Sequence, residues 1–145
     1  MSTPRDDRGH VFKRMIMQTV RYAILHHTGI AEPHYDILIE LSPGSASLRT
    51  WRATAWPIDQ PTDLVPLPDH RNLYLTYEGP ISQNRGHVTR VAGGQCLVTM
   101  SDDSQWLVRL PDDSVINLVQ VTPTHWLALP LPASPQTMAP PSPFG

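Results

Sequence analysis

The sequence is poor in lysine and cysteine. Lys13 is the single lysine among 11 basic residues, and the others are arginines. Nucleotidyl transfer and Schiff-base catalysis both need a lysine nucleophile, so a central region without lysine excludes them. Cys96 is the only cysteine, which excludes an internal disulfide and a thiolate metal cluster.

Charged residues and long apolar runs are also scarce. Charged side chains make up 17% of the 145 residues, and the net charge is −2. This balance does not support a broad basic face that coats a duplex, although a few arginines can still hold a nucleic-acid end. No run approaches the roughly 18 apolar residues of a membrane span, and the charged start is not of signal-peptide type. We therefore expect a cytoplasmic monomer without membrane contact.

The composition predicts one folded domain between two polar tails. Residues 1–17 are mostly polar or charged, and residues 132–145 are rich in proline. Such a proline density favours a disordered or extended segment. We therefore expect a β-domain over 18–131, a polar N-terminal tail over 1–17 and a proline-rich C-terminal tail over 132–145.

The central region has the pattern of an all-β fold. Short segments rich in β-branched and aromatic residues alternate with turn signals such as Gly79-Pro80, Gly93-Gly94 and Asp112-Asp113. Many short strands at this spacing predict an antiparallel barrel or sandwich. Any helical segment is expected to be short and to flank the strands, within 5–18 or 61–70.

The stretch HHTGIAEPHYDILIE, residues 26–40, gathers three histidines and an aspartate around a turn. Alternate strand residues share a face, so His34 and Asp36 point the same way, with Ile37 on the opposite face. If the flanking strands pair as a hairpin, His27 ends the first strand where His34 begins the second.

Two imidazoles and one carboxylate can hold Mn²⁺, Fe²⁺ or Zn²⁺. The set His27, His34 and Asp36 is therefore a candidate metal site with open positions for water or substrate. His26 competes with His27, and strand spacing prefers His27. The alternative is that these are ordinary polar residues at a hairpin mouth.

An ordered series of motifs resembles the 3′-phosphoesterase domain of bacterial DNA ligase D and its stand-alone relatives. The series is His27, His34-Tyr35-Asp36, Trp51, Asp69-His70, Tyr74 and Tyr77-Glu78-Gly79, then Gly86. It covers about residues 20–129. No single motif in it is decisive, and its specificity comes from the order.

The resemblance implies a small β-barrel that uses Mn²⁺ to trim 3′ ends of DNA, removing a terminal ribonucleoside or 3′-phosphate. It implies that His27, His34 and Asp36 bind the metal and that His70 and Tyr74 contact the scissile phosphate. The implied partners are DNA 3′ ends, together with a repair ligase or polymerase.

The chain departs from the family pattern where phosphate-binding arginines are expected. Leu38 stands two residues after the strand aspartate, where the family has an arginine. Arg52 is the first candidate substitute and Arg21 the second, with Arg85 and Arg90 more distant. The four tryptophans, at 51, 56, 106 and 126, are expected to pack in the core or at its rim.

Two other functions remain open from the sequence. A non-catalytic relative would bind DNA ends or a repair partner without turnover, as the missing arginines suggest. A non-haem iron oxygenase would combine His34 and Asp36 with a distal histidine, either His87 or His125.

Overall fold

The computed structural model describes residues 15–132, and the remainder of both predicted tails lies outside them. The described chain is built almost wholly from strands, which confirms the all-β prediction. The first strand begins at Ile16, inside the segment assigned to the N-terminal tail. No helix in residues 15–132 is long and apolar enough to cross a membrane. The elements are β1 (Ile16–Thr28), β2 (His34–Glu40), β3 (Ser47–Ala53), β4 (Thr62–Arg71), η1 (Asn72–Leu75), β5 (Gly79–Pro80), β6 (His87–Met100), β7 (Gln105–Arg109), β8 (Val115–Thr122) and β9 (His125–Leu131).

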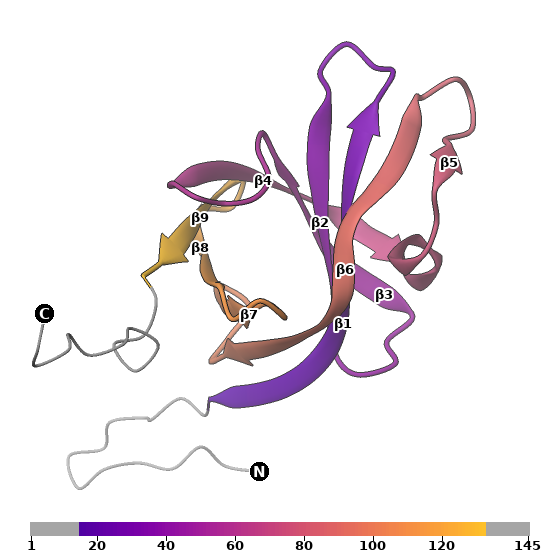
Figure 1. Ribbon diagram of the computed structural model, residues 1–145. Coiled ribbons are helices and arrows are strands. Elements are labelled where there is room, and N and C mark those ends of the chain that lie inside the picture. Colours follow the sequence, from indigo (N-terminus) through magenta and orange to yellow (C-terminus); the bar gives the residue numbers. More distant parts are fainter. Residues whose placement is uncertain (1–14, 133–145) are drawn as a thin grey trace, which may run out of the picture.

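The strands form a closed antiparallel barrel, as the family resemblance implies. The hydrogen-bonded order is β1-β2-β3-β4-β9-β8-β7-β6-β5, and an additional pairing of β1 with β6 closes eight strands into a ring. The short β5 is an extra strand on the free edge of β6 (Figure 1). Closure leaves the barrel with almost no unpaired sheet edge.

The barrel interior is an apolar core centred on three tryptophans. Trp51 packs edge-to-face against Trp106 and Trp126, with ring centroids 5.3 Å apart in both pairs. All three are at most 1% exposed, which confirms their predicted packing role. The Arg49 guanidinium covers this cluster, 5.2 Å from the Trp51 centroid, where it adds cation–π attraction. Trp56 is partly buried against the same core.

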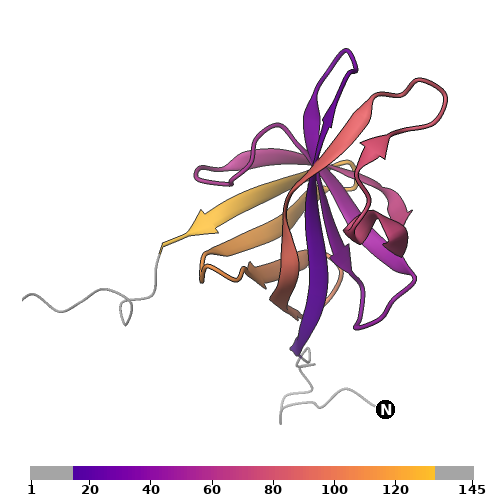
Figure 2. The same cartoon turned by 45° about the vertical axis from the view of Figure 1, so that its right-hand side comes forward.

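A second apolar cluster lies outside the barrel. Leu25, Leu38 and Val88 belong to it, and Leu75 of η1 covers them. In Figure 2 the coil of η1 and strand β5 lie together on the outer side of the barrel wall. The wall formed by β1 and β2 is therefore buried on both faces at this place. Strand β2 accordingly has the continuous apolar run Ile37-Leu38-Ile39 rather than alternating apolar and polar residues.

Two local predictions were wrong between residues 61 and 79. Residues 61–70 include most of strand β4 rather than a helix. The alternating leucines and tyrosines over 71–79 predict a strand, but this segment contains the 3-10 helix η1. Pro66 and Pro68 fit β4 because its pairing with β9 ends at Leu64, and a strand edge without a partner needs no donor. The segment Asn72–Leu75 is held to the barrel by the packing of Leu75 on the wall, and not by pairing with a neighbouring strand.

The turn predicted at Gly93-Gly94 is also absent, because both glycines continue β6. They lie opposite Ala23 and Tyr22 of β1 in the longest strand pairing of the barrel. A Cβ on Gly93 would collide with the Arg90 guanidinium. The absence of a side chain at Gly93 therefore allows the Arg90 side chain to lie close to the backbone. A glycine pair in the sequence resembles a turn even where it serves this purpose.

Cys96 lies inside the barrel. Burial raises the pKa of its thiol to about 12, with the negative charge of Glu40 adding to the effect. A thiol with such a pKa remains protonated at neutral pH and is a poor nucleophile, so Cys96 takes no part in the chemistry discussed below.

Glu40 is a buried carboxylate held by three hydrogen bonds near the end of β2. Its side chain is 1% exposed. It accepts bonds from the Arg21 backbone N–H at 2.6 Å, the Arg21 guanidinium at 3.1 Å and the Gly44 N–H at 2.9 Å. Burial acts to raise the pKa of Glu40, but these bonds outweigh it and hold the pKa below the ordinary 4.5.

A lowered folded-state pKa means that Glu40 stabilises the fold above pH 4.5 and loses this contribution as the pH falls through the lowered value. We expect Glu40→Gln to lower the free energy of unfolding at pH 7 by about 2 kcal/mol, a modest loss for a buried charge because Arg21 is half exposed. The loss should shrink as the pH falls below 4.5 and passes through the lowered pKa. Urea titrations at pH 7 and pH 3 measure both effects. Glu32→Gln, at an exposed glutamate, is the matched control, and an equal loss at both pH values would contradict the argument.

Candidate metal centre

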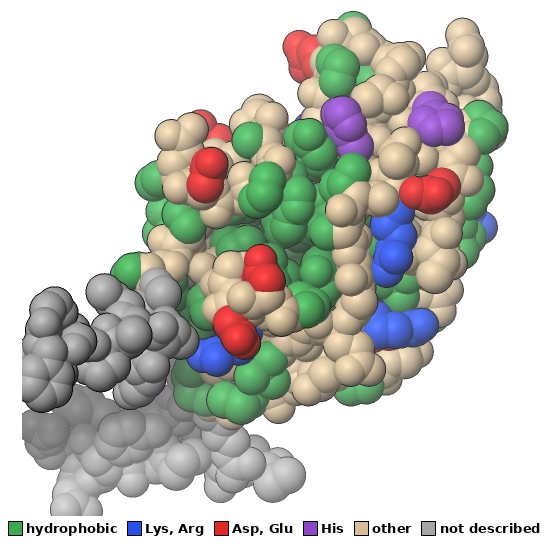
Figure 3. All heavy atoms as spheres, viewed as in Figure 1, with side chains coloured by type: hydrophobic (Ala, Val, Ile, Leu, Met, Phe, Trp, Pro, Cys, Tyr) green, Lys and Arg blue, Asp and Glu red, His purple; other side chains and the backbone are tan. Residues whose placement is uncertain are grey.

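Two of the cavities among the described residues differ in character. The larger, about 370 Å³, lies at the barrel mouth between Trp56, Ile58 and Leu110, where Figure 3 shows hydrophobic side chains gathered. The smaller, about 220 Å³, lies on the outer face and brings together His27, His34, Asp36, Arg52, His70, Tyr74 and Arg85. Convergent polar groups mark a functional site better than volume does, so the smaller cavity is the candidate site.

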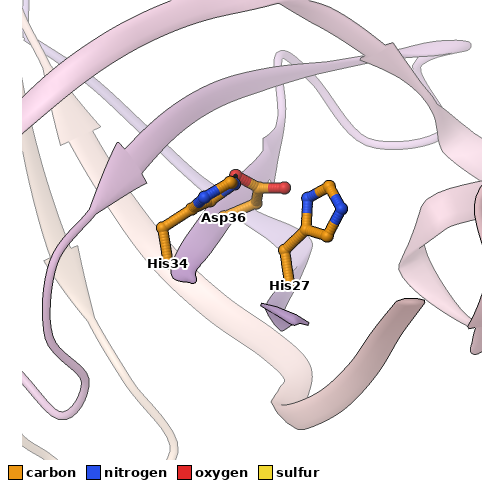
Figure 4. Close-up of side chains that lie close together, drawn as sticks. All are labelled: His27, His34 and Asp36. Carbon is orange, nitrogen blue, oxygen red and sulfur yellow. Dashed lines mark ion pairs between the residues drawn. The ribbon is translucent and has the colours of Figure 1, made fainter. Parts of the chain in front are cut away.

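Strand pairing brings His27, His34 and Asp36 together. His27 of β1 lies directly opposite His34 of β2, as the hairpin hypothesis predicted. One potential ligand atom from each of the three residues lies within 4.8 Å of the others. Figure 4 shows the Asp36 carboxylate between the two imidazole rings. Atoms bound to one ion at about 2.1 Å stand roughly 3 to 4 Å apart, so small side-chain movements would complete a site.

The contact between His34 and Asp36 is the least satisfied part of the group. His34 Nε2 lies 3.3 Å from Asp36 Oδ1, and the two side chains are 5% and 7% exposed. Neither atom has a hydrogen-bond partner. His34 Nδ1 lies 3.0 Å from the Glu32 carbonyl, which places its proton there in the neutral ring. A lone pair on Nε2 then faces a carboxylate oxygen, and a cation between them removes the repulsion.

His27 is anchored in the complementary way. Its Nε2 donates to the Arg85 carbonyl at 2.6 Å, which leaves Nδ1 with the lone pair. In metal sites the second ring nitrogen usually binds such a carbonyl, which fixes the tautomer and the ring orientation. Both histidines therefore have the partner expected of a ligand. The donor set suits Mn²⁺, Fe²⁺ or Zn²⁺.

His70 and Tyr74 reach the cavity from β4 and η1. Their rings are 5.5 Å apart in an edge contact, and the Pro68 carbonyl accepts a bond from His70 Nδ1 at 3.0 Å. The alternation of His70, Asn72 and Tyr74 with leucines predicts a single strand, which is wrong because η1 begins at Asn72. A turn of 3-10 helix nevertheless returns Tyr74 to the same side as His70.

Arg52 is the arginine that the strand pairing places nearest the carboxylate. It lies directly opposite Asp36, on β3, and lines the cavity while remaining exposed. Directly opposite residues share one face of a sheet. Arg21 is instead held by Glu40 on the same wall, away from the cavity, so it does not compensate for Leu38. Arg90 extends over Gly93.

The other histidines within residues 15–132 lie elsewhere. His26 stacks on Tyr35, with ring centroids 4.4 Å apart, and it is His27 that lies in one group with His34 and Asp36. His125 bonds to Asp63 at 2.8 Å. Neither His125 nor His87 lines the cavity or joins the ligand group among residues 15–132.

Sequence reasoning named Arg85 and Gly86 but missed that their turn contacts His27. The Arg85 carbonyl orients His27, and Gly86 has φ +83° with its Cα against the hairpin turn at Gly29. A Cβ on Gly86 would lie 3.2 Å from His27 Nε2. The composition of Asn84-Arg85-Gly86 is typical of a turn, but the bond between the Arg85 carbonyl and His27 joins residues 58 apart in the sequence.

Comparison with known proteins does not identify the chain. No protein-family model matches the sequence, and no curated protein matches it significantly. The residues of the outer cavity therefore carry the functional argument by themselves.

Proposed function

We propose that the protein is a metal-dependent phosphoesterase that acts on 3′ ends of nucleic acid. The observation that carries the proposal is the outer cavity, where Arg52 lies opposite Asp36 beside two further histidines of the ligand group and His70. Phosphoryl transfer is accelerated by a metal ion that polarises the phosphoryl group, by a cationic side chain for the phosphate oxygens and by a proton donor for the leaving group. The cavity has one residue type suited to each need.

His27, His34 and Asp36 would hold the divalent ion, with Mn²⁺ favoured by the family resemblance. When bound, such an ion polarises a phosphoryl oxygen and acidifies a bound water. Arg52 would neutralise the developing charge on the phosphate. His70 would donate a proton to the leaving 3′ oxygen as water attacks phosphorus and the P–O bond breaks. Tyr74 would orient His70 through its ring contact.

Leu38 supports a second candidate, a binder of nucleic-acid ends that has no activity. The side chain is 0% exposed and packs in the outer apolar cluster. It cannot be exchanged for an arginine without opening that cluster. A buried, well-packed leucine therefore stands at the position where the family resemblance implies a phosphate-binding arginine.

Phosphate release separates the two functions. We expect the full chain with Mn²⁺ to release inorganic phosphate from a 3′-phosphorylated primer-template. Arg52→Gln and His70→Ala should each lower kcat/KM by about 100-fold, since each removes charge stabilisation or proton donation. Arg109→Gln and His125→Ala, outside the cavity, are the matched controls. Binding of the primer-template without phosphate release, by folded and metal-loaded protein, would reject the enzyme and leave the binder.

A further inference from the structure

Arg85 is a second arginine of the outer cavity, and it approaches from a different element than Arg52. Arg52 extends from β3, whereas Arg85 lies in the turn between β5 and β6. This turn is closed by a hydrogen bond of 2.8 Å from the Ile81 N–H to the Gly86 carbonyl. The residues that line the cavity thus include two arginines, from two different elements, and a single carboxylate, Asp36.

The backbone and side chain of Arg85 have separate tasks. The backbone carbonyl accepts the bond from His27. The exposed guanidinium donates from Nε to the Ser82 carbonyl at 2.9 Å and from Nη2 to the Ser82 hydroxyl at 3.1 Å. Both acceptors are neutral, so the guanidinium charge has no counter-ion there, whereas a phosphate can pair with that charge through two parallel hydrogen bonds. A phosphate in reach would therefore draw the guanidinium from Ser82.

One terminal phosphate does not need both arginines. Under the proposed function, Arg52 and the ion already neutralise the terminal group, and a bound divalent ion leaves the cavity with excess positive charge. A polynucleotide offers a further anion at its next internucleotide phosphate, which a mononucleotide lacks. An arginine can bind such a phosphate with two parallel hydrogen bonds.

We propose that Arg85 contacts the internucleotide phosphate next to the terminal one, and so selects polynucleotide ends over small phosphate esters. The inference rests on the proposed phosphoesterase function and names the substrate feature that its site would read. Arg85 is a specificity-determining residue in this scheme and takes no part in bond cleavage.

The test compares a 3′-phosphorylated single-stranded oligonucleotide with p-nitrophenyl phosphate, both with Mn²⁺. We expect the wild-type chain to prefer the oligonucleotide. Arg85→Gln should lower kcat/KM about tenfold for the oligonucleotide and by a clearly smaller factor for p-nitrophenyl phosphate. The slope of log kcat/KM against log salt should become shallower by about 0.7 for the oligonucleotide, the value of one lost single-strand phosphate contact.

Ser82→Ala separates charge from loop structure, because it removes one tether and leaves the guanidinium. Its selectivity should equal or exceed that of the wild type, while Arg109→Gln should leave the selectivity ratio of the two substrates as it is. Equal losses on both substrates in Arg85→Gln, or the same loss of selectivity in Ser82→Ala, would overturn the role of Arg85 and leave the phosphoesterase intact. Absence of turnover on both substrates would overturn both proposals.

Discussion

Asp36→Asn is expected to weaken Mn²⁺ binding by more than about 100-fold, because an anionic ligand becomes a neutral amide. The same change should raise the thermal stability of the metal-free protein. In the wild type, His34 Nε2 and Asp36 Oδ1 lie 3.3 Å apart, buried and without hydrogen-bond partners. An asparagine amide can donate to His34 Nε2 and so replace a repulsive contact by a hydrogen bond.

The paired readout distinguishes a metal site from a structural ion pair. Thermal melts of metal-free protein give the stability, and titration with Mn²⁺ followed by electron paramagnetic resonance gives the affinity. Asp63→Asn is the matched control, since Asp63 bonds to His125 at an exposed position. If His34 were protonated and paired with Asp36, Asp36→Asn would destabilise the metal-free protein and the wild type would bind no Mn²⁺.

Strand periodicity predicted the parts of this site that lie on paired strands. His34, Asp36 and His27 follow from side-chain alternation and from the hairpin register, both of which are local in sequence. Side-chain alternation also predicts that His27, and not His26, shares a face with His34 and Asp36, and the three potential ligands lie together in the structure. The sequence also indicated Arg52 as the first candidate substitute arginine, although only the pairing of β3 with β2 places it opposite Asp36.

The rest of the site depends on contacts that the local pattern does not contain. The segment 71–79 has alternating leucines and tyrosines that favour a strand, but Leu75 packs over the barrel wall and a 3-10 helix results. The Gly93-Gly94 pair has the composition of a turn, yet pairing with β1 keeps it extended. Tertiary packing overrides propensity at both places.

Substitution of Gly86 by alanine should have a large effect on both the unfolding free energy and the Mn²⁺ affinity, second only to that of Asp36→Asn. Gly44 and Gly86 have φ values of +79° and +83°, so alanine is strained at both by roughly 1 kcal/mol. They differ in their surroundings. A Cβ on Gly44 has nothing within 4 Å, whereas a Cβ on Gly86 meets the Thr28 carbonyl oxygen, with Ile30 Cγ2 at 2.9 Å.

We therefore expect Gly44→Ala to lose roughly 1 kcal/mol of unfolding free energy, and Gly86→Ala to lose about 3 kcal/mol or more through the added overpacking. Relief of the collision must move the turn before β6 away from the hairpin. That movement lengthens the bond from His27 Nε2 to the Arg85 carbonyl, now 2.6 Å, and releases the orientation of the ring. Mn²⁺ affinity should consequently fall at least about tenfold in Gly86→Ala and remain at the wild-type value in Gly44→Ala. Urea titration and Mn²⁺ titration measure the two effects. An undiminished affinity in folded Gly86→Ala would mean that the Arg85 carbonyl does not orient His27 for metal binding, and the ligand group would then have to rest on His34 and Asp36.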